Sequence, residues 1–274
     1  MIKKLLIIAI LIYCLFISIK WVLRFLDGYK TIQSSFSSGN VIVFGKKGKG
    51  KDLIFNYAIN TRGIRCASNI PFNKDICKVR PIKDYNLDPN TFENMLNDNV
   101  KICKKTINEG EDYYISDGGI FLPSQYEGML CKLYPSLPMF YATSRHLAQM
   151  NIHINSQYLG RVWDKLREQA NTYIKCIESN KLFNKYIITK CIFYDQYKTA
   201  MAEMLPFPKQ LFESKENKSK RIEFEAHNGI VKYFYVIQKI KHIYYDTRYF
   251  HKVFYGKFAP IEYVNEIKTP KYYI

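Results

Sequence analysis

The sequence lacks the cysteine pattern of a disulfide framework or a zinc site. Its seven cysteines are odd in number and scattered along the chain, and no two stand in a Cys-x-x-Cys pair. Such spacing is typical of reduced thiols in a cytosolic domain. The pattern therefore argues against a small secreted protein held together by disulfides.

Acidic residues are also scarce. The 274 residues hold 24 Asp and Glu against 41 Lys and Arg, a formal net charge of +17. This surplus favours nucleic acid, nucleotides or anionic lipid as partners and does not bear on the fold. An AT-rich genome, which enriches Lys, Ile, Asn and Tyr, is the alternative explanation. The length suits one good-sized domain plus an attachment.

Charged residues are absent from Leu5 to Ile19, and Lys20, Trp21 and Arg24 follow closely. A membrane span needs about 20 apolar residues, and flanking lysine, arginine and tryptophan side chains reach the interface. A secretory signal peptide is the alternative, but no small-x-small cleavage site follows. A buried core helix is disfavoured because the run has no polar face. We expect residues 1–27 to be a transmembrane anchor.

A strand, a glycine- and lysine-rich loop and a helix are predicted in succession. Val41–Phe44 is typical of a buried strand, and Leu53 to Phe55 opens the helix. The intervening residues fit the G-x-x-x-x-G-K pattern, in which backbone N–H groups, a helix N-terminus and a lysine neutralise a polyphosphate. A basic surface turn is the alternative. The predicted nucleotide-binding residues are Gly45, Lys46, Lys47, Gly48, Lys49, Gly50, Lys51 and Asp52.

The loop departs from the pattern at its last position. Asp52 replaces the usual Ser or Thr, whose hydroxyl holds Mg²⁺. A carboxylate can hold Mg²⁺ directly or through water, but it also repels phosphate. We expect ATP and Mg²⁺ as cofactors, and therefore a cytoplasmic location for the bulk of the chain, with the N-terminus outside.

Two later segments are predicted strands that end in polar residues. Tyr113 to Ser116 favours a strand, and Asp117 and two glycines follow. In a phosphate-loop NTPase a second strand lies beside the first and ends in an Asp that positions Mg²⁺. We assign that role to Asp117; an ordinary turn is the alternative. Asn151–Gln157 alternates as a strand does, and Gln157 is placed to sense the γ-phosphate. Strands alternating with helices predict a parallel sheet covered on both faces.

The C-terminal third is predicted to be rich in β-structure. Residues 173–177 and 186–193 alternate around a turn and indicate a hairpin, whereas 215–220 is predicted to be a charged loop. Residues 232–255 are dense in Tyr and Phe. Basic residues interleaved with aromatics suit single-stranded DNA; aromatic strands packing a small β core are the alternative. The predicted divisions are a 1–27 anchor, a Ser-rich linker at 28–39, an ATPase domain at 40–205 and a β-rich domain at 206–274.

Four places in the sequence resemble the Zot / gene I family of filamentous-phage assembly ATPases, which are zonula occludens toxin-like proteins within the FtsK/HerA-like P-loop NTPases. They are the phosphate loop, Ser68-Asn-Ile-Pro71, the strand ending at Asp117, and the run from Gln157 through Arg161 to Glu168. Tyr245-Asp-Thr247 is similar to a tripeptide in the family's C-terminal part.

The resemblance implies an α/β, RecA-like ATPase that extrudes a virion through the inner membrane as a homo-oligomeric ring with phage coat and assembly proteins. It implies that Lys51 binds the β- and γ-phosphates and that Asp52 and Asp117 hold Mg²⁺. It also implies that Gln157 contacts the γ-phosphate or the attacking water, and that an arginine such as Arg161 acts across a subunit boundary.

The sequence departs from this family at Gly118, where a water-activating Glu is usual, and in placing its membrane span before the ATPase. Glu111, Asp112 or Glu127 is a possible substitute base. Two alternatives stay open: a DNA-translocating or packaging ATPase, and a membrane scaffold that binds nucleotide without efficient hydrolysis.

Overall fold

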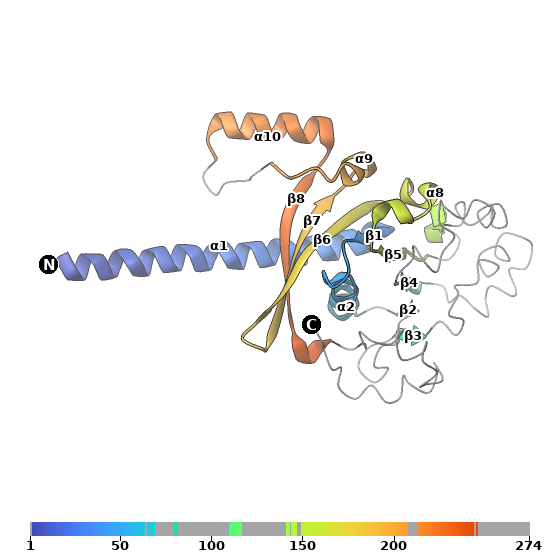
Figure 1. Cartoon of the computed structure of the whole chain (residues 1–274), viewed down its shortest axis with the longest axis horizontal. Helices are drawn as coiled ribbons and strands as arrows, with labels where there is room; N and C mark the ends of the chain where they lie inside the picture. Colours follow the sequence, from blue (N-terminus) through green and yellow to red (C-terminus); the bar gives the residue numbers. More distant parts are fainter. Residues whose placement is uncertain are drawn as a thin grey trace, which may run out of the picture.

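An eight-stranded sheet forms the centre of the protein (Figure 1). The computed structural model describes residues 2–63, 65–68, 79–81, 110–116, 141–142, 144–146, 149–207, 213–243 and 245. The strands lie in the order β3-β2-β4-β5-β1-β6-β7-β8. Their bounds are β1 Val41–Phe44, β2 Cys66–Ser68, β3 Val79–Pro81, β4 Asp112–Ile115, β5 Ile152–Ser156, β6 Thr172–Leu182, β7 Tyr186–Tyr194 and β8 Val231–Lys239.

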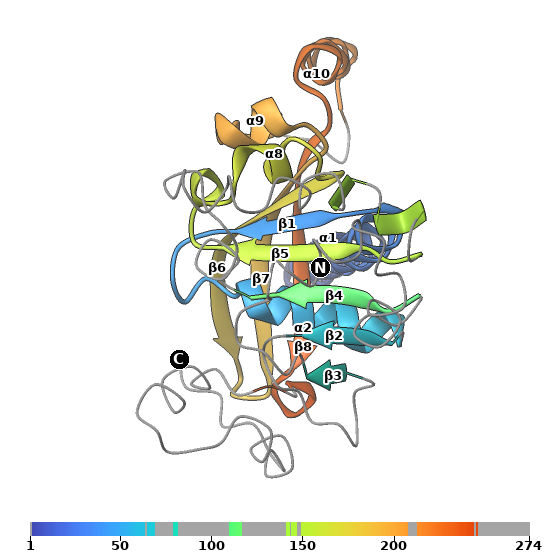
Figure 2. The same ribbon diagram turned by 90° about the vertical axis from the view of Figure 1, so that its right-hand side faces the viewer.

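The first six strands in that order are parallel, and β6, β7 and β8 are joined in antiparallel pairs. Figure 2 shows the parallel part, with β1, β5, β4, β2 and β3 one below another. The residues of β1, β4 and β5 are buried at every position, as in a parallel sheet covered on both faces. The predicted α/β fold with a parallel sheet and the predicted β6–β7 hairpin are both confirmed.

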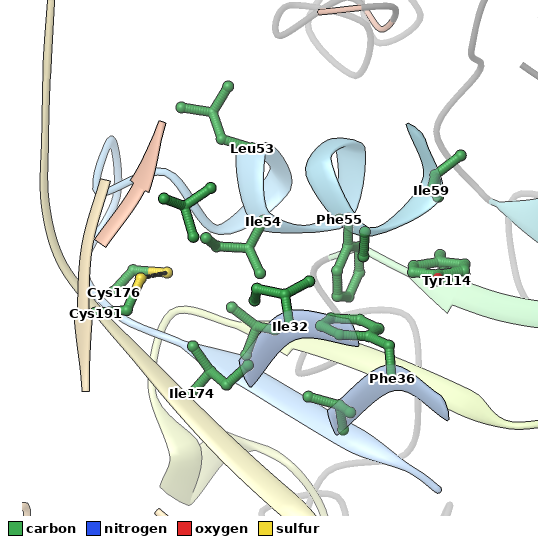
Figure 3. Packing of buried hydrophobic residues seen from close by; sticks show 14 of the residues in the cluster. Ile32, Phe36, Leu53, Ile54, Phe55, Ile59, Tyr114, Ile174, Cys176 and Cys191 are labelled. Carbon is green, nitrogen blue, oxygen red and sulfur yellow. Dashed lines mark hydrogen bonds between the residues drawn. The ribbon is translucent and has the colours of Figure 1, made fainter. Parts of the chain in front are cut away.

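Two hydrophobic clusters cover the two faces of the sheet. Ile42 and Phe44 point into one, beside α8 (Asp164–Arg167) and α9 (Tyr197–Met201). Val41 and Val43 point into the other, which holds α2 (Lys51–Arg62) and the end of α1. Figure 3 shows side chains of α1 and α2 meeting over this second face. Consecutive residues of β1 therefore serve opposite cores, as period-two alternation requires.

Helix α1 runs unbroken from Ile2 to Ser38. Its N-terminal half projects beyond the sheet (Figure 1). From Leu6 onward it is long and apolar enough to cross a membrane, with an 18-residue window of mean hydropathy 2.6. The prediction of a linker at 28–39 is wrong, since residues 28–38 stay helical and Ile32 and Phe36 are 0 % exposed. Burial of this apolar face outweighs the low helix propensity of the serines.

The C-terminal third differs from the prediction at two places. Residues 215–220 belong to helix α10 (Lys215–Asn228), which Ser214 caps by accepting a hydrogen bond from the Asn217 N–H at 3.2 Å. Strand β8, expected in a separate β-rich domain, extends the central sheet by pairing with β7. Two short 3-10 helices, η1 (Leu159–Arg161) and η2 (Ile240–His242), complete the described elements. The tail beyond 245 lies outside the described residues, so a domain boundary at 206 stays a prediction.

Candidate functional site

The glycine- and lysine-rich loop joins the carboxyl end of β1 to the start of α2. The Gly45 N–H donates to the Ser156 carbonyl of β5 at 3.3 Å, and the Lys49 N–H donates to the Lys46 carbonyl at 3.3 Å. Gly48 and Gly50 have φ values of 77° and 89°, a region that side chains other than glycine rarely adopt. The chain thus reverses direction at the carboxyl edge of the parallel sheet.

The loop leaves the N-terminus of α2 open to an anion. Gly50 is the N-cap residue, and no side chain caps the first turn. The Lys51 side chain is 7 % exposed, and its Nζ donates to the Lys46 carbonyl at 3.4 Å. Uncapped N–H groups, the positive end of the helix dipole and an ammonium group are therefore gathered at one point. This is the chemistry of a phosphate-binding site.

Asp52, in the first turn of α2, contacts the ends of two neighbouring strands. Its Oδ1 accepts hydrogen bonds from Asn155 Nδ2 at 2.5 Å and from the Ser116 hydroxyl at 2.8 Å. Asn155 lies in β5 and Ser116 directly follows β4, so the carboxylate is fixed at the carboxyl edge of the sheet. Sequence reasoning missed Ser116 and Asn155. Asn155 is one of three polar residues in β5, so the composition of the strand does not single it out.

The same three residues fit a magnesium ion. Carboxylate, hydroxyl and amide oxygens are hard ligands, and Mg²⁺ is held by one or two carboxylates together with substrate phosphates. Among the described residues, no group of three His, Cys, Asp or Glu forms a dedicated metal cage. Asp52 is the described carboxylate that would hold the ion. Asp117, the other predicted ligand, lies outside the described residues, as does Gly118.

The β6–β7 hairpin packs closely against the glycine- and lysine-rich loop. A Cβ added at Gly50 would lie 2.1 Å from Ser179 Oγ, and one at Gly45 would lie 2.4 Å from the Cys176 carbonyl oxygen. The Ser179 hydroxyl contacts the Lys49 carbonyl at 3.3 Å and the Thr189 hydroxyl at 2.8 Å.

The Lys49 carbonyl therefore has a hydrogen-bond donor on the hairpin. Sequence reasoning missed this role of the hairpin. The signal available was Thr189, a polar residue on the apolar face of β7.

The predicted neighbourhood of the second strand needs a correction. Strand β4 does not lie beside β1, because β5 pairs with both. Asp112 begins β4 and Glu111 precedes it, so both lie at the amino end of a strand parallel to β1. The loop lies at the opposite, carboxyl end, which removes both residues as substitutes for the missing base. Glu127 lies outside the described residues.

The structure separates the other catalytic candidates. Gln157 directly follows β5 at the carboxyl edge and is half-buried. Its contact with the phosphates stays a prediction. Arg161 is exposed, and its guanidinium lies 5.3 Å from the centre of the Tyr158 ring. Arg167 is instead buried and lies over the Tyr197 ring at 5.6 Å. Arg167 therefore has a packing role in the first hydrophobic cluster.

A buried polar cluster occupies the amino end of β4. Asp112 pairs with Arg62 at 2.7 Å and with His153 Nε2 at 3.4 Å, and its other oxygen accepts the Asn151 N–H at 2.9 Å. Burial lowers the pKa of His153 from its ordinary 6.5, against the opposing effect of Asp112. Burial alone would raise the pKa of Asp112, but its hydrogen bonds hold it below 3.8. The cluster joins the end of α2 to two strands.

Comparison with known proteins gives distant structural likenesses. No family model and no curated sequence matches the chain. The genome packaging NTPase B204 of Sulfolobus turreted icosahedral virus 2, with ATP-gammaS, is 13 % identical with a TM-score of 0.39, over 59 % of this chain and 94 % of that one. The N-terminal domain of zonular occludens toxin from Neisseria meningitidis is 16 % identical with a TM-score of 0.40, over 66 % and 97 %.

Similarity at this level assigns neither a family nor a substrate to the chain. The fold is established by its own geometry, in which strand β1, the loop ending in Gly50-Lys51 and helix α2 follow one another on a parallel sheet. This arrangement is an α/β P-loop NTPase fold.

Proposed function

We propose that this protein binds ATP with Mg²⁺ at residues 45–52 and hydrolyses it at the inner membrane to assemble and export a filamentous virion. The observation that carries nucleotide binding is the buried Lys51 ammonium beside the uncapped first turn of α2. Together these supply the positive charge and N–H donors that a triphosphate requires.

The proposal gives each residue of the site a role. Lys51 binds the β- and γ-phosphates, while Asp52 holds Mg²⁺ with the support of Ser116 and Asn155. The bound ion would neutralise charge on the phosphates. Gln157 orients the attacking water from the end of β5. The exposed Arg161 belongs to the same edge and is available to a neighbouring subunit of a ring, where an arginine stabilises charge in the transition state.

Membrane attachment is proposed from α1. Its exposed apolar half has the length and composition of a span. The proposed use of ATP, which is found in the cytoplasm, supports a cytoplasmic side for the remainder of the chain. The assignment to filamentous virion assembly, with coat and assembly proteins as partners, comes from the sequence resemblance described above.

The test of hydrolysis is a turnover measurement on the full chain in lipid vesicles, with and without Gly118→Glu. A positioned base contributes about 10²–10⁴-fold, so the wild-type protein should be slow and the variant faster at unchanged ATP affinity. Brisk turnover by a wild-type monomer, unaffected by Gly118→Glu, would show that the water is activated elsewhere. If the protein binds ATP but shows no turnover under any condition, the result would instead favour a membrane scaffold that binds nucleotide without hydrolysing it.

A DNA-translocating motor is the second candidate, favoured by the net charge of +17. Single- and double-stranded DNA added to the same assay separate it from virion export. Stimulation that falls steeply with salt is the expected behaviour of a motor that grips the phosphate backbone. A turnover rate indifferent to DNA excludes this candidate.

A further inference from the structure

Helix α1 fixes the distance between the sheet and any membrane that the helix crosses. A hydrocarbon core of about 30 Å takes about 20 helical residues, which is the distance from Leu5 to Arg24. The headgroup layer on each side is about 5–8 Å thick. Gly28, four residues or about 6 Å farther along, touches β8, because a Cβ there would lie 1.9 Å from the Tyr235 carbonyl oxygen. The edge strand therefore meets α1 at the boundary between the hydrocarbon core and the headgroups.

The contact between α1 and β8 has the composition of a membrane interface. The Trp21 ring lies 5.4 Å from the Tyr235 ring, and the Arg24 guanidinium lies 5.6 Å from the same ring. Lys232 of β8 pairs with Asp27 at 3.6 Å. Tryptophan and tyrosine concentrate at the headgroup level of membranes, where arginine and lysine meet lipid phosphates.

The tip of the β6–β7 hairpin points to the same side. Figure 1 shows it on the side of the sheet from which α1 projects, and Figure 2 places α1 between this tip and α10. Phe183 at the tip is 83 % exposed, with a positive φ of 50°. Exposed lysines, Lys181 and Lys185, flank it. An exposed aromatic ring between two lysines suits the boundary between acyl chains and anionic headgroups.

Resting on the proposed membrane span, we infer that the hairpin tip and the Trp21–Tyr235 contact seat the domain on an anionic lipid surface. Phe183 enters the interfacial layer, and Lys181 and Lys185 bind lipid phosphates. The domain then has one fixed orientation on the membrane, because α1 is a single rigid helix and the hairpin is a second point of attachment.

The test places a single tryptophan at the tip of the full-length chain. The sequence has two tryptophans, Trp21 and Trp163, which are changed by Trp21→Tyr and Trp163→Phe before Phe183→Trp is added. In vesicles containing phosphatidylglycerol and brominated lipid, the emission should shift to the blue and be quenched. The matched control is Tyr158→Trp in the same background, an exposed position that follows β5 and lies outside the β6–β7 hairpin; its emission should stay unquenched.

Charge is tested by adding Lys181→Gln and Lys185→Gln. Each cation near an anionic surface contributes about 1 kcal/mol, or about fivefold in affinity. The ratio of protein with a lipid-bound hairpin tip to protein with the tip in water should therefore fall about 25-fold. Pure phosphatidylcholine vesicles should also weaken the quenching. Hydrogen exchange of wild-type residues 181–186 is the second measurement, and phosphatidylglycerol should slow it.

The outcomes separate this inference from the proposed span. If the chain resists carbonate extraction but the tip is unquenched and its hydrogen exchange does not depend on lipid, the hairpin does not bind the membrane. The proposed span is then unaffected. Carbonate release with a quenched tip overturns the span and supports the surface contact. Release with an unquenched tip contradicts both.

Discussion

At the scale of single residues, two glycines of the phosphate loop differ in what surrounds them. Both have a positive φ, but a Cβ at Gly48 meets nothing within 4 Å, whereas one at Gly50 meets Ser179 Oγ at 2.1 Å. We predict that Gly48→Ala costs only the backbone strain of about 1–2 kcal/mol. Gly50→Ala should cost more, since Ser179 and the Lys49 carbonyl must also move.

The measurement is the thermal unfolding of both variants together with their ATP affinity. Gly50→Ala should lose affinity to a greater extent than Gly48→Ala. Equal affinities would mean that the hairpin does not shape the loop.

The buried His153–Asp112 pair makes stability depend on pH. His153 has a lowered pKa, so below 6.5 the unfolded chain takes up a proton that the folded protein resists. Stability should therefore fall as the pH drops through 6.5. The pKa of Asp112 is also lowered, so its stabilising effect is lost at a lower pH, as the carboxylate is protonated below 3.8.

The variant that tests this dependence is His153→Phe, whose ring suits the neighbouring Phe36 and Tyr114 rings. We predict that it removes the loss of stability that begins near pH 6.5 and keeps the loss at lower pH. Unfolding temperatures from about pH 2 to 8 provide the measurement, with the same change at the exposed His227 as the control. An unchanged profile in His153→Phe would assign the pH dependence to other groups.

The part of the candidate site that can be proposed from the sequence is the part whose residues lie in consecutive positions. Gly45 through Lys51 can be recognised because one strand, one turn and one helix start build the site. Ser116, Asn155 and Ser179 could not be assigned, because their contacts with Asp52 and Lys49 depend on which strands become neighbours. That order is set by packing between segments far apart in the chain and has no local signal.

At the scale of elements, α1 belongs to two environments. Its C-terminal turns enter the core, where the Phe36 ring lies 6.2 Å from Phe55 and 5.8 Å from Tyr114 (Figure 3). A Ser-rich stretch suggested a tether because its composition is polar. The spacing of Ile32 and Phe36, four residues apart on one helical face, was the signal for burial.

We predict that Phe36→Ala destabilises the protein by about 3–5 kcal/mol, because it removes a fully buried ring. Phe25→Ala, in the same helix but only partly buried, is the matched control and should cost less. Chemical denaturation of the full chain in detergent micelles measures both. Equal losses would restore the interpretation of residues 28–38 as a tether.

At the scale of the whole molecule, one rigid helix and one loop would connect the proposed membrane span to the proposed nucleotide site. Helix α1 packs against α2, whose first residues belong to that proposed site, within a single hydrophobic cluster. The parallel sheet could be predicted from the alternation of strands and helices. Its extension by β8 could not, since the same β-favouring sequence suits a separate small domain.

The central claim is that Lys51 and the first turn of α2 bind the phosphates of ATP. Calorimetric titration of ATP into wild-type protein, Lys51→Ala and Lys218→Ala tests it most directly, since Lys218 is an exposed lysine of α10, outside residues 45–52. Lys51→Ala removes charge-assisted bonds of about 1.5–3 kcal/mol each and should weaken binding at least about tenfold, while Lys218→Ala changes it little. Equal ATP affinity in wild type and Lys51→Ala would contradict the phosphate-loop account.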